Sequence, residues 1–218
     1  MQKAEVITAL DKAKLESPKR NFKQSFDIVM NLAGLDMKKT ENQVDQFIQL
    51  HYSPGRQTKV CALVGPELKD MATGSVDMTI LVDDFDKYAA NKKMTKKLAA
   101  EYTFFIGQAN IMPKIASAFG RVLGSRGKMP NPKAGLIVPP NANLKPLYEK
   151  LQKTVRASAR TAPVIQCMLG KEDMNTEELA DNFIMIYNAI VNALPGGENN
   201  VRNVFVKLTM GKPVRVVK

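Results

Sequence analysis

The chain has 218 residues, of which 32 are lysine or arginine and 21 are aspartate or glutamate, so its formal net charge is +11. A hydrophobic content of 44% is enough to build buried cores, which excludes a disordered tail. The excess positive charge favours a polyanionic partner, with nucleic acid ahead of an anionic membrane surface. No apolar run approaches the ~20 residues of a transmembrane helix, and we expect no signal peptide at the N-terminus.

Metal and redox chemistry have few candidate residues in this chain. Cys61 and Cys167 lie far apart inside apolar segments, so we expect buried free thiols, as in a reducing cytoplasm. His51 is the single histidine, and it makes no zinc-binding constellation with two remote cysteines. The acidic cluster at 83–86 begins a predicted helix, where the helix dipole accounts for it better than magnesium does. We therefore expect neither a metal nor another cofactor.

The first part of the chain predicts a helix followed by antiparallel strands. Residues 2–16 carry an apolar stripe at helical spacing. In residues 22–32 every second residue is apolar except Gln24, and the other parity is mostly polar. This alternation is typical of an antiparallel strand with one buried face. A second strand is expected near residues 47–51.

The middle of the chain, residues 59–153, has a different pattern. Short, nearly continuous apolar runs alternate with helical stretches. Strands that are apolar on both faces and alternate with helices predict a small parallel sheet with helices on both sides. The expected strands lie at 60–64, 79–82 and 104–106, and the expected helices at 66–72, 84–100, 111–119 and 143–153.

The alternating pattern returns after residue 153. It predicts strands at 155–160, 164–169 and 201–210 and a helix at 176–194, which opens with a capping signal at Asn175. The predicted fold class is therefore α/β, with two domains. An α+β domain with an antiparallel sheet is formed by residues 1–58 and 154–218, and a three-layer α/β domain, residues 59–153, is inserted into it.

Residues 121–135 form a basic stretch that favours contact with phosphate. From Tyr102 through Tyr148 there are six lysines or arginines and no acidic residue, whereas soluble surfaces normally mix both signs. Glycines in the stretch allow close approach of the backbone, and prolines restrain it. We expect a shaped cationic loop that makes secondary RNA contacts through Arg121, Arg126, Lys128 and Lys133.

The same stretch does not contain a nucleotide-binding motif. Gly127-Lys128 is followed by Met129 instead of a hydroxyl residue, and Val122 stands where a phosphate-binding loop has its first glycine. The glycine spacing does not match the Gly-x-Gly-x-x-Gly dinucleotide fingerprint either. These absences argue against the main enzymatic alternative, a nucleotide-dependent transferase built on the α/β domain, and we predict that the protein is not an enzyme.

The first domain offers a second candidate surface, formed by the alternate strand positions that carry polar residues. Hydroxyl and guanidinium donors are expected on one sheet face or edge, with Phe22 nearby either as an aromatic contact or as a core residue. At the end of the last predicted strand, a hydroxyl, a flexible thioether and bare backbone follow one another and suit close contact with a ribose edge. These residues are Ser25, Arg156, Ser158 and Arg160 for the donors, and Thr209, Met210 and Gly211 for the strand end.

Several of these motifs resemble one family over essentially the whole chain. They are Gly120-Arg-Val-Leu-Gly-Ser-Arg-Gly-Lys-Met-Pro-Asn-Pro-Lys-Ala-Gly135, Leu208-Thr-Met-Gly211, Lys38-Lys-Thr-Glu-Asn-Gln-Val44 and Leu179-Ala-Asp-Asn182, which fall in the expected order. The chain is similar to the family of large-subunit ribosomal protein L-one, which forms the mobile stalk beside the tRNA exit site.

The resemblance implies a structural constituent of the large ribosomal subunit with an inserted Rossmann-like domain. The implied partners are large-subunit rRNA, exit-site tRNA and the protein's own mRNA, whose translation the protein would repress. A free monomer is expected, in the cytoplasm and on the ribosome, without membrane contact. The principal RNA surface is implied at Phe22, Ser25, Thr209, Met210 and Gly211, with Arg156, Ser158 and Arg160 in the corresponding strand region.

A general DNA-binding protein remains an alternative that accounts for the charge but not for the motifs.

Overall fold

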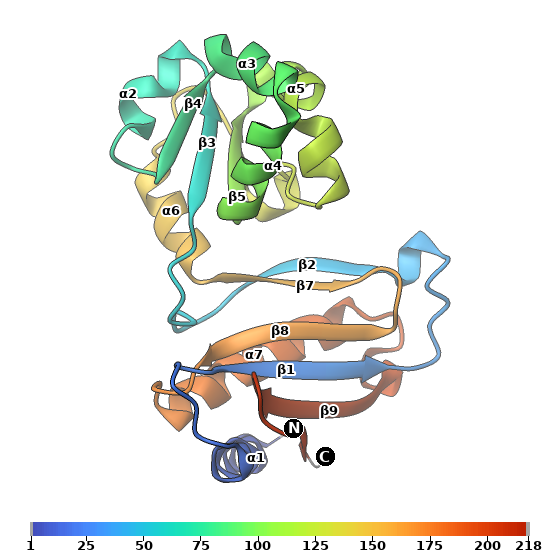
Figure 1. Ribbon diagram of the computed structural model, residues 1–218. Helices are drawn as coiled ribbons and strands as arrows, with labels where there is room; N and C mark the ends of the chain where they lie inside the picture. Colours follow the sequence, from blue (N-terminus) through green and yellow to red (C-terminus); the bar gives the residue numbers. More distant parts are fainter. Residues whose placement is uncertain (1, 217–218) are drawn as a thin grey trace. The chain divides into compact units, whose positions relative to one another are not determined.

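The computed structural model describes residues 2–216, which divide into two compact units (Figure 1). Unit 1 contains the described residues up to Arg56 and those from Lys153 onward, and unit 2 contains Gln57–Gln152. The predicted mixed fold, with antiparallel strand pairing in one unit and a parallel sheet in the other, is confirmed. Within residues 2–216, no helix is long and apolar enough to cross a membrane.

Unit 1 is built on a four-stranded antiparallel sheet in the order β10-β9-β1-β8. Burial alternates strictly along β1, because its even-numbered side chains pack into the core and its odd-numbered ones do not. The apolar stripes of α1 and α7 belong to the same core cluster as these side chains. The elements are α1 (Lys3–Glu16), β1 (Ser25–Leu32), β8 (Val164–Lys171), α7 (Thr176–Ala193), β9 (Val201–Leu208) and β10 (Val214–Val216).

A separate two-stranded sheet completes unit 1. It pairs β2 (Val44–Gln49) with β7 (Thr154–Ala159) in antiparallel register. The expectation that the donors of β7 share one sheet with Ser25 is therefore wrong. Alternation along each strand indicated the face of each side chain, but the pairing of β7 with β2 is a long-range choice that local pattern does not contain. Two 3₁₀ turns, Thr40–Asn42 and Gly197–Asn200, lie in the connections.

Helix α7 is anchored by a buried asparagine on its otherwise apolar face. The Asn182 amide donates to the carbonyl oxygens of Tyr52 and Leu169, and its Oδ1 accepts from the Tyr52 N–H, each at 3.1 Å. Asn182 is fully buried, so these three bonds are shielded from water. One side chain thus ties α7 both to the segment after β2 and to β8.

We expect Asn182→Ala to lower the free energy of unfolding by about 2–3 kcal/mol, because it leaves buried backbone groups without partners. Asn188→Ala is the matched control, since Asn188 is exposed on the same helix and the change in helix propensity is the same. Urea unfolding of the full chain, followed by circular dichroism, measures both. Equal midpoints for the two variants would contradict the anchoring role.

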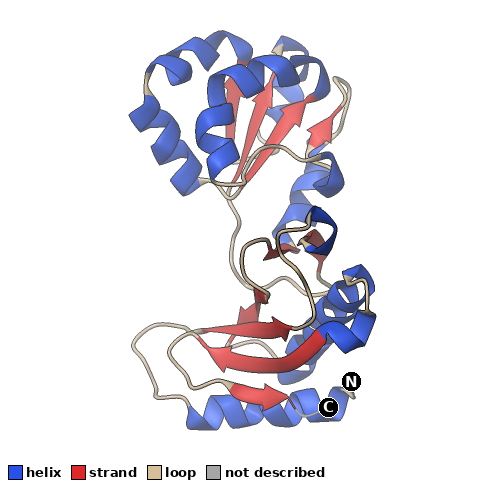
Figure 2. Cartoon of the chain, turned by 90° about the vertical axis from the view of Figure 1, so that its right-hand side faces the viewer, coloured by secondary structure: helices blue, strands red, loops and turns tan. Residues whose placement is uncertain are grey.

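Unit 2 is a parallel sheet in the order β4-β3-β5-β6, and helices lie on both sides of its strands (Figure 2). Every residue of β3 and β5 is buried, as expected for strands covered on both faces. The elements are β3 (Val60–Val64), α2 (Lys69–Ala72), β4 (Met78–Leu81), α3 (Phe85–Ala90), α4 (Lys92–Glu101), β5 (Phe104–Gln108), α5 (Met112–Ser125), β6 (Ile137–Val138) and α6 (Leu144–Gln152), with 3₁₀ turns at Pro66–Leu68, Val82–Asp84, Ala109–Ile111 and Pro132–Ala134.

The basic stretch 121–135 is not a loop throughout, because α5 continues to Ser125. The helix extends beyond its predicted end since Leu123 continues the buried stripe of Ile115 and Phe119. Gly127 then ends it with a φ of 63°, and the N–H groups of Gly127 and Lys128 bond back to the carbonyls of Gly124 and Leu123. This is the Schellman arrangement, in which glycine takes the left-handed position.

Both cysteines are buried and free, as predicted. Burial raises the pKa of the Cys61 thiol to about 12. Burial and, to a lesser extent, the charge of Asp27 raise the pKa of the Cys167 thiol to about 12. Neither thiol is therefore a nucleophile at neutral pH, because the thiolate is the reactive form.

Candidate nucleic-acid interface

The end of the four-stranded sheet at which β1 begins and β9 ends carries an exposed turn, Thr209–Gly211, here termed the corner. The Thr209 N–H donates to the Ser25 carbonyl at 3.0 Å, and the Ser25 N–H donates to Thr209 Oγ1, also at 3.0 Å. The Gly211 N–H then closes the turn on the Leu208 carbonyl at 2.9 Å. These bonds fix the backbone of the corner, while the Met210 side chain remains 54% exposed.

Phe22 lies before β1 at the same end of the sheet. The strand begins at Ser25, three residues later than predicted, and Phe22 is 52% exposed, so it does not pack in the core. Phe22, shortly before β1, and Met210, shortly after β9, therefore both present apolar side chains to solvent. Such groups suit stacking and van der Waals contact with bases and sugars.

The predicted donors of β7 form a cluster around one carboxylate on the two-stranded sheet. Arg156 binds Asp45 through two hydrogen bonds, of 2.7 and 3.1 Å, and Arg160 binds the same carboxylate. Arg156 also lies over the Phe47 ring, 5.6 Å from its centroid. Ser158 is the register partner of Asp45 on the opposite strand. The two guanidinium groups are therefore held in place by the protein itself.

Sequence reasoning missed Asp45, because its partners lie 111 and 115 residues away. Partial burial acts to raise the pKa of Asp45, but hydrogen bonds from Arg156 and Arg160 and their positive charges outweigh it and hold the pKa below its usual value. Asp45 side-chain exposure is 19%, so solvent screens this ion pair less than a surface pair.

We expect Asp45→Asn to lower the stability of the protein at pH 7, with a difference from the wild type that shrinks in acid. The folded-state pKa lies below the unfolded value of about 3.9, so the contribution is fully present above about pH 5. It is lost as the pH falls through the folded-state pKa. Urea unfolding from pH 7 to about pH 2.5 measures this, with Asp70→Asn, at an exposed position of α2, as control. A difference that stays constant to the lowest pH would contradict the ion pair as its source.

The four cations predicted for secondary RNA contact differ in how they are held. Arg121 is exposed on α5, and Lys133 is exposed in the turn after it. Arg126 is exposed but donates to the Lys96 carbonyl at 3.1 Å. The Lys128 ammonium is partly buried and donates to the carbonyls of Ala99 and Tyr102, both at 2.8 Å. Lys128 therefore caps the C-terminal end of α4, where carbonyls lack helical partners.

We expect Lys128→Ala to lower the free energy of unfolding by about 1–3 kcal/mol, since two carbonyls lose a charged donor. Lys133→Ala removes the same charge from an exposed position and is expected to change stability by no more than about 0.5 kcal/mol. Thermal unfolding of both full-length variants checks this. If the two variants unfold at the same temperature, Lys128 has no capping role.

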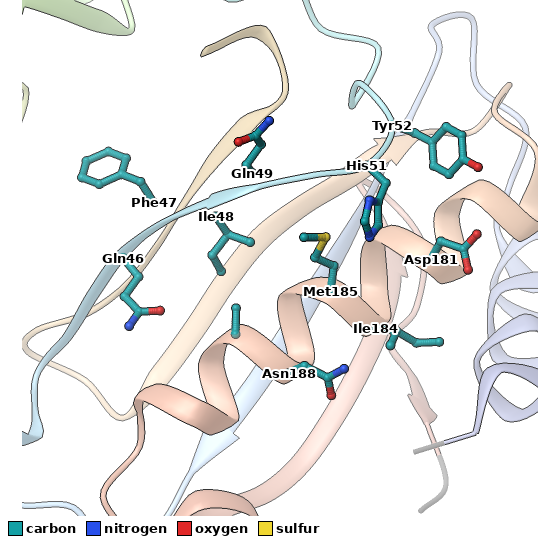
Figure 3. A pocket seen from close by; sticks show the side chains of 11 residues that line it. Gln46, Phe47, Ile48, Gln49, His51, Tyr52, Asp181, Ile184, Met185 and Asn188 are labelled. Carbon is teal, nitrogen blue, oxygen red and sulfur yellow. The ribbon is translucent and has the colours of Figure 1, made fainter. Parts of the chain in front are cut away.

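A groove of about 900 Å³ lies between β2 and α7, also in unit 1. Gln46, Ile48 and His51 face α7 from one side of β2, and Phe47 points to the other side (Figure 3). The groove also contains Asp181, whose carboxylate is ion-paired with Lys3 at 2.5 Å. Among the described residues that line it there is no serine, threonine or cysteine.

The comparison with protein families identifies the kind of protein to which this two-unit chain is similar. The model of the Ribosomal protein L1p/L10e family matches residues 12–212. The chain belongs to this family. Because the family consists of structural ribosomal proteins, the prediction that the protein is not an enzyme is confirmed.

Individual relatives match along nearly their full length. The large ribosomal subunit protein uL1 of Methanothermococcus thermolithotrophicus is 37% identical over 218 residues, which is 100% of both chains. The protein of the same name from Nanoarchaeum equitans is 39% identical over 206 residues, covering 93% of this chain and 95% of the relative. That of Thermococcus kodakarensis is 37% identical over 212 residues, covering 97% and 96%.

Proposed function

We propose that this protein is a structural component of the large ribosomal subunit that binds large-subunit rRNA through unit 1, at the mobile stalk beside the tRNA exit site. The observation that carries the proposal is the corner, whose backbone is held by hydrogen bonds to β1 while its methionine faces solvent. Membership of the L1p/L10e family supports the same assignment. The proposed location is the ribosome, in the cytoplasm.

Recognition in this proposal has two physical components. Lysines and arginines attract phosphates, which supplies affinity that falls as salt rises. The fixed corner then reads RNA shape and 2′-hydroxyls, which DNA lacks. Because the corner does not have to be ordered on binding, little conformational entropy is lost there. Thr209 holds the turn to Ser25 through its hydroxyl, Met210 supplies an adaptable apolar contact and Gly211 a backbone without a side chain.

The proposal includes two further partners for the same protein. An mRNA segment that presents the same shape as the rRNA site would compete for the corner, and by this route the protein would repress its own translation when rRNA is scarce. The exit-site tRNA would be the second partner, as the family resemblance implies. Secondary contacts are assigned to Arg121, Arg126 and Lys133, with the free protein a monomer.

We expect Met210→Ala and Thr209→Ala each to weaken binding to a stalk rRNA fragment by roughly 1–3 kcal/mol, the range of other specific readout contacts. Met71→Ala is the matched control, because Met71 of α2 is 52% exposed and Met210 is 54% exposed. Filter binding or fluorescence anisotropy in moderate salt measures the affinity of each variant. Unchanged affinity in both corner variants would remove the corner from the interface.

The wild-type measurement includes a scrambled RNA and the equivalent duplex DNA as competitors. Specific rRNA recognition requires that neither competitor displaces the fragment at equal concentration. If DNA competes as well as the rRNA fragment does, the general DNA-binding alternative replaces the proposal.

A further inference from the structure

Gln24 breaks the apolar pattern of the chain segment that leads into β1. It occupies one of the even-numbered positions of residues 22–32, which are otherwise apolar, and only 3% of it is exposed. A buried amide needs hydrogen-bond partners, because an unpaired one costs about 1–3 kcal/mol. Gln24 directly precedes Ser25, the residue to which Thr209 of the corner is bonded.

The partners of Gln24 belong to three segments that are distant in sequence. Its Oε1 accepts from the Met210 N–H at 3.0 Å, across 186 residues. Its Nε2 donates to Ser17 Oγ and to the Pro18 carbonyl, both at 3.3 Å. Its own carbonyl accepts from the Glu172 N–H at 3.0 Å. One residue thus joins the corner, the connection after α1 and the end of β8.

The space around Gly211, the last residue of the corner, is also restricted. A Cβ added to Gly211 would lie 3.1 Å from Ser17 Oγ and 3.2 Å from Leu208 Cβ, which is tighter than ordinary van der Waals contact. Ser17, which Gln24 binds, is therefore also the residue against which Gly211 packs. The corner is confined between this serine and the Gln24 amide.

We propose that Gln24 is a positioning residue for RNA recognition: it contacts no RNA itself but holds the Met210 backbone and the basic segment 18–20 in one arrangement. Lys19 and Arg20 of this segment line a hollow of about 470 Å³ that Gln24 also lines. The inference rests on the proposed function of the corner. It assigns the RNA-facing geometry to an amide, which supplies both the acceptor for the Met210 N–H and the donor to the Pro18 carbonyl, as neither a carboxylate nor an ammonium group can.

Gln24→Leu tests the role by removing donor and acceptor at similar size. We expect the affinity for the stalk rRNA fragment to fall about 10-fold to 100-fold, while the affinity for scrambled RNA changes less than about threefold. Gln166→Leu, at an exposed position of β8, is the matched control and is expected to leave both affinities unchanged. A purely structural defect would lower both affinities by the same factor, because the apparent affinity is proportional to the folded fraction.

Gln24→Glu provides a second test, in which the affinity for scrambled RNA is measured at each pH to separate specific recognition from a change in the folded fraction. Its carboxylate accepts from Met210 but cannot donate to the Pro18 carbonyl, whereas the protonated form can donate. Burial and the carboxylates of Glu172 and Asp173 raise the pKa of a carboxyl group at this position, whereas Lys14, Lys19 and Arg20, which line the same hollow, lower it. We expect the specific affinity of this variant, divided by that of the wild type, to rise as the pH is lowered from 8 to 5.

A double-mutant cycle with Met210→Ala completes the experiment. If Gln24 acts through the corner, the combined loss is smaller than the product of the single losses. Losses that multiply, a Gln24→Leu affinity equal to that of the wild type, or a pH-independent Gln24→Glu ratio would each overturn the inference. A wild-type protein without preference for the stalk fragment would instead overturn the proposed function, so the two failures are distinguishable.

Discussion

The strict alternation of burial along β1 is the constraint on which unit 1 depends. Its even-numbered side chains must pack into the core with α1 and α7, so the strand cannot slip by one residue without burying its polar face. Register then fixes Ser25 opposite the end of β9 and turns the chain outward at Thr209. The exposed corner therefore results from core packing, and its rigidity comes from the sheet to which it is attached.

The basic residues of this protein are not equivalent, although composition treats them alike. Lys128 bonds to helix-end carbonyls, Arg156 and Arg160 share one carboxylate, and Arg121 and Lys133 lie exposed. Cations that bond to other protein groups stabilise the structure and keep a fixed orientation. Exposed cations are mobile, and their attraction for anions is screened by salt. Net charge thus indicates the class of partner, and the contacts of each cation determine its part in binding.

Hydrogen bonds from side chains to backbone connect distant segments in unit 1. Asn182 joins α7 to β8 and to the segment after β2, and Gln24 joins the corner to the segment after α1. Both are amides at positions where an apolar residue would fit the pattern. An amide offers donor and acceptor together, so it can satisfy backbone groups at strand and helix ends that regular secondary structure leaves unpaired.

Sequence patterns predict the fold class, the buried stripes of α1 and α7 and the two-sided burial of β3 and β5, because hydrophobic periodicity is local and follows directly from packing. The same patterns mark Gln24 as an exception and include Gly127, which ends α5, although they do not reveal the role of either residue. The folded structure was needed to show that β7 pairs with β2, that Asp45 binds two arginines, that Lys128 caps α4 and that Gln24 binds the Met210 N–H. Each of these contacts joins residues that no local pattern relates, since their proximity arises only when strands and helices pack together.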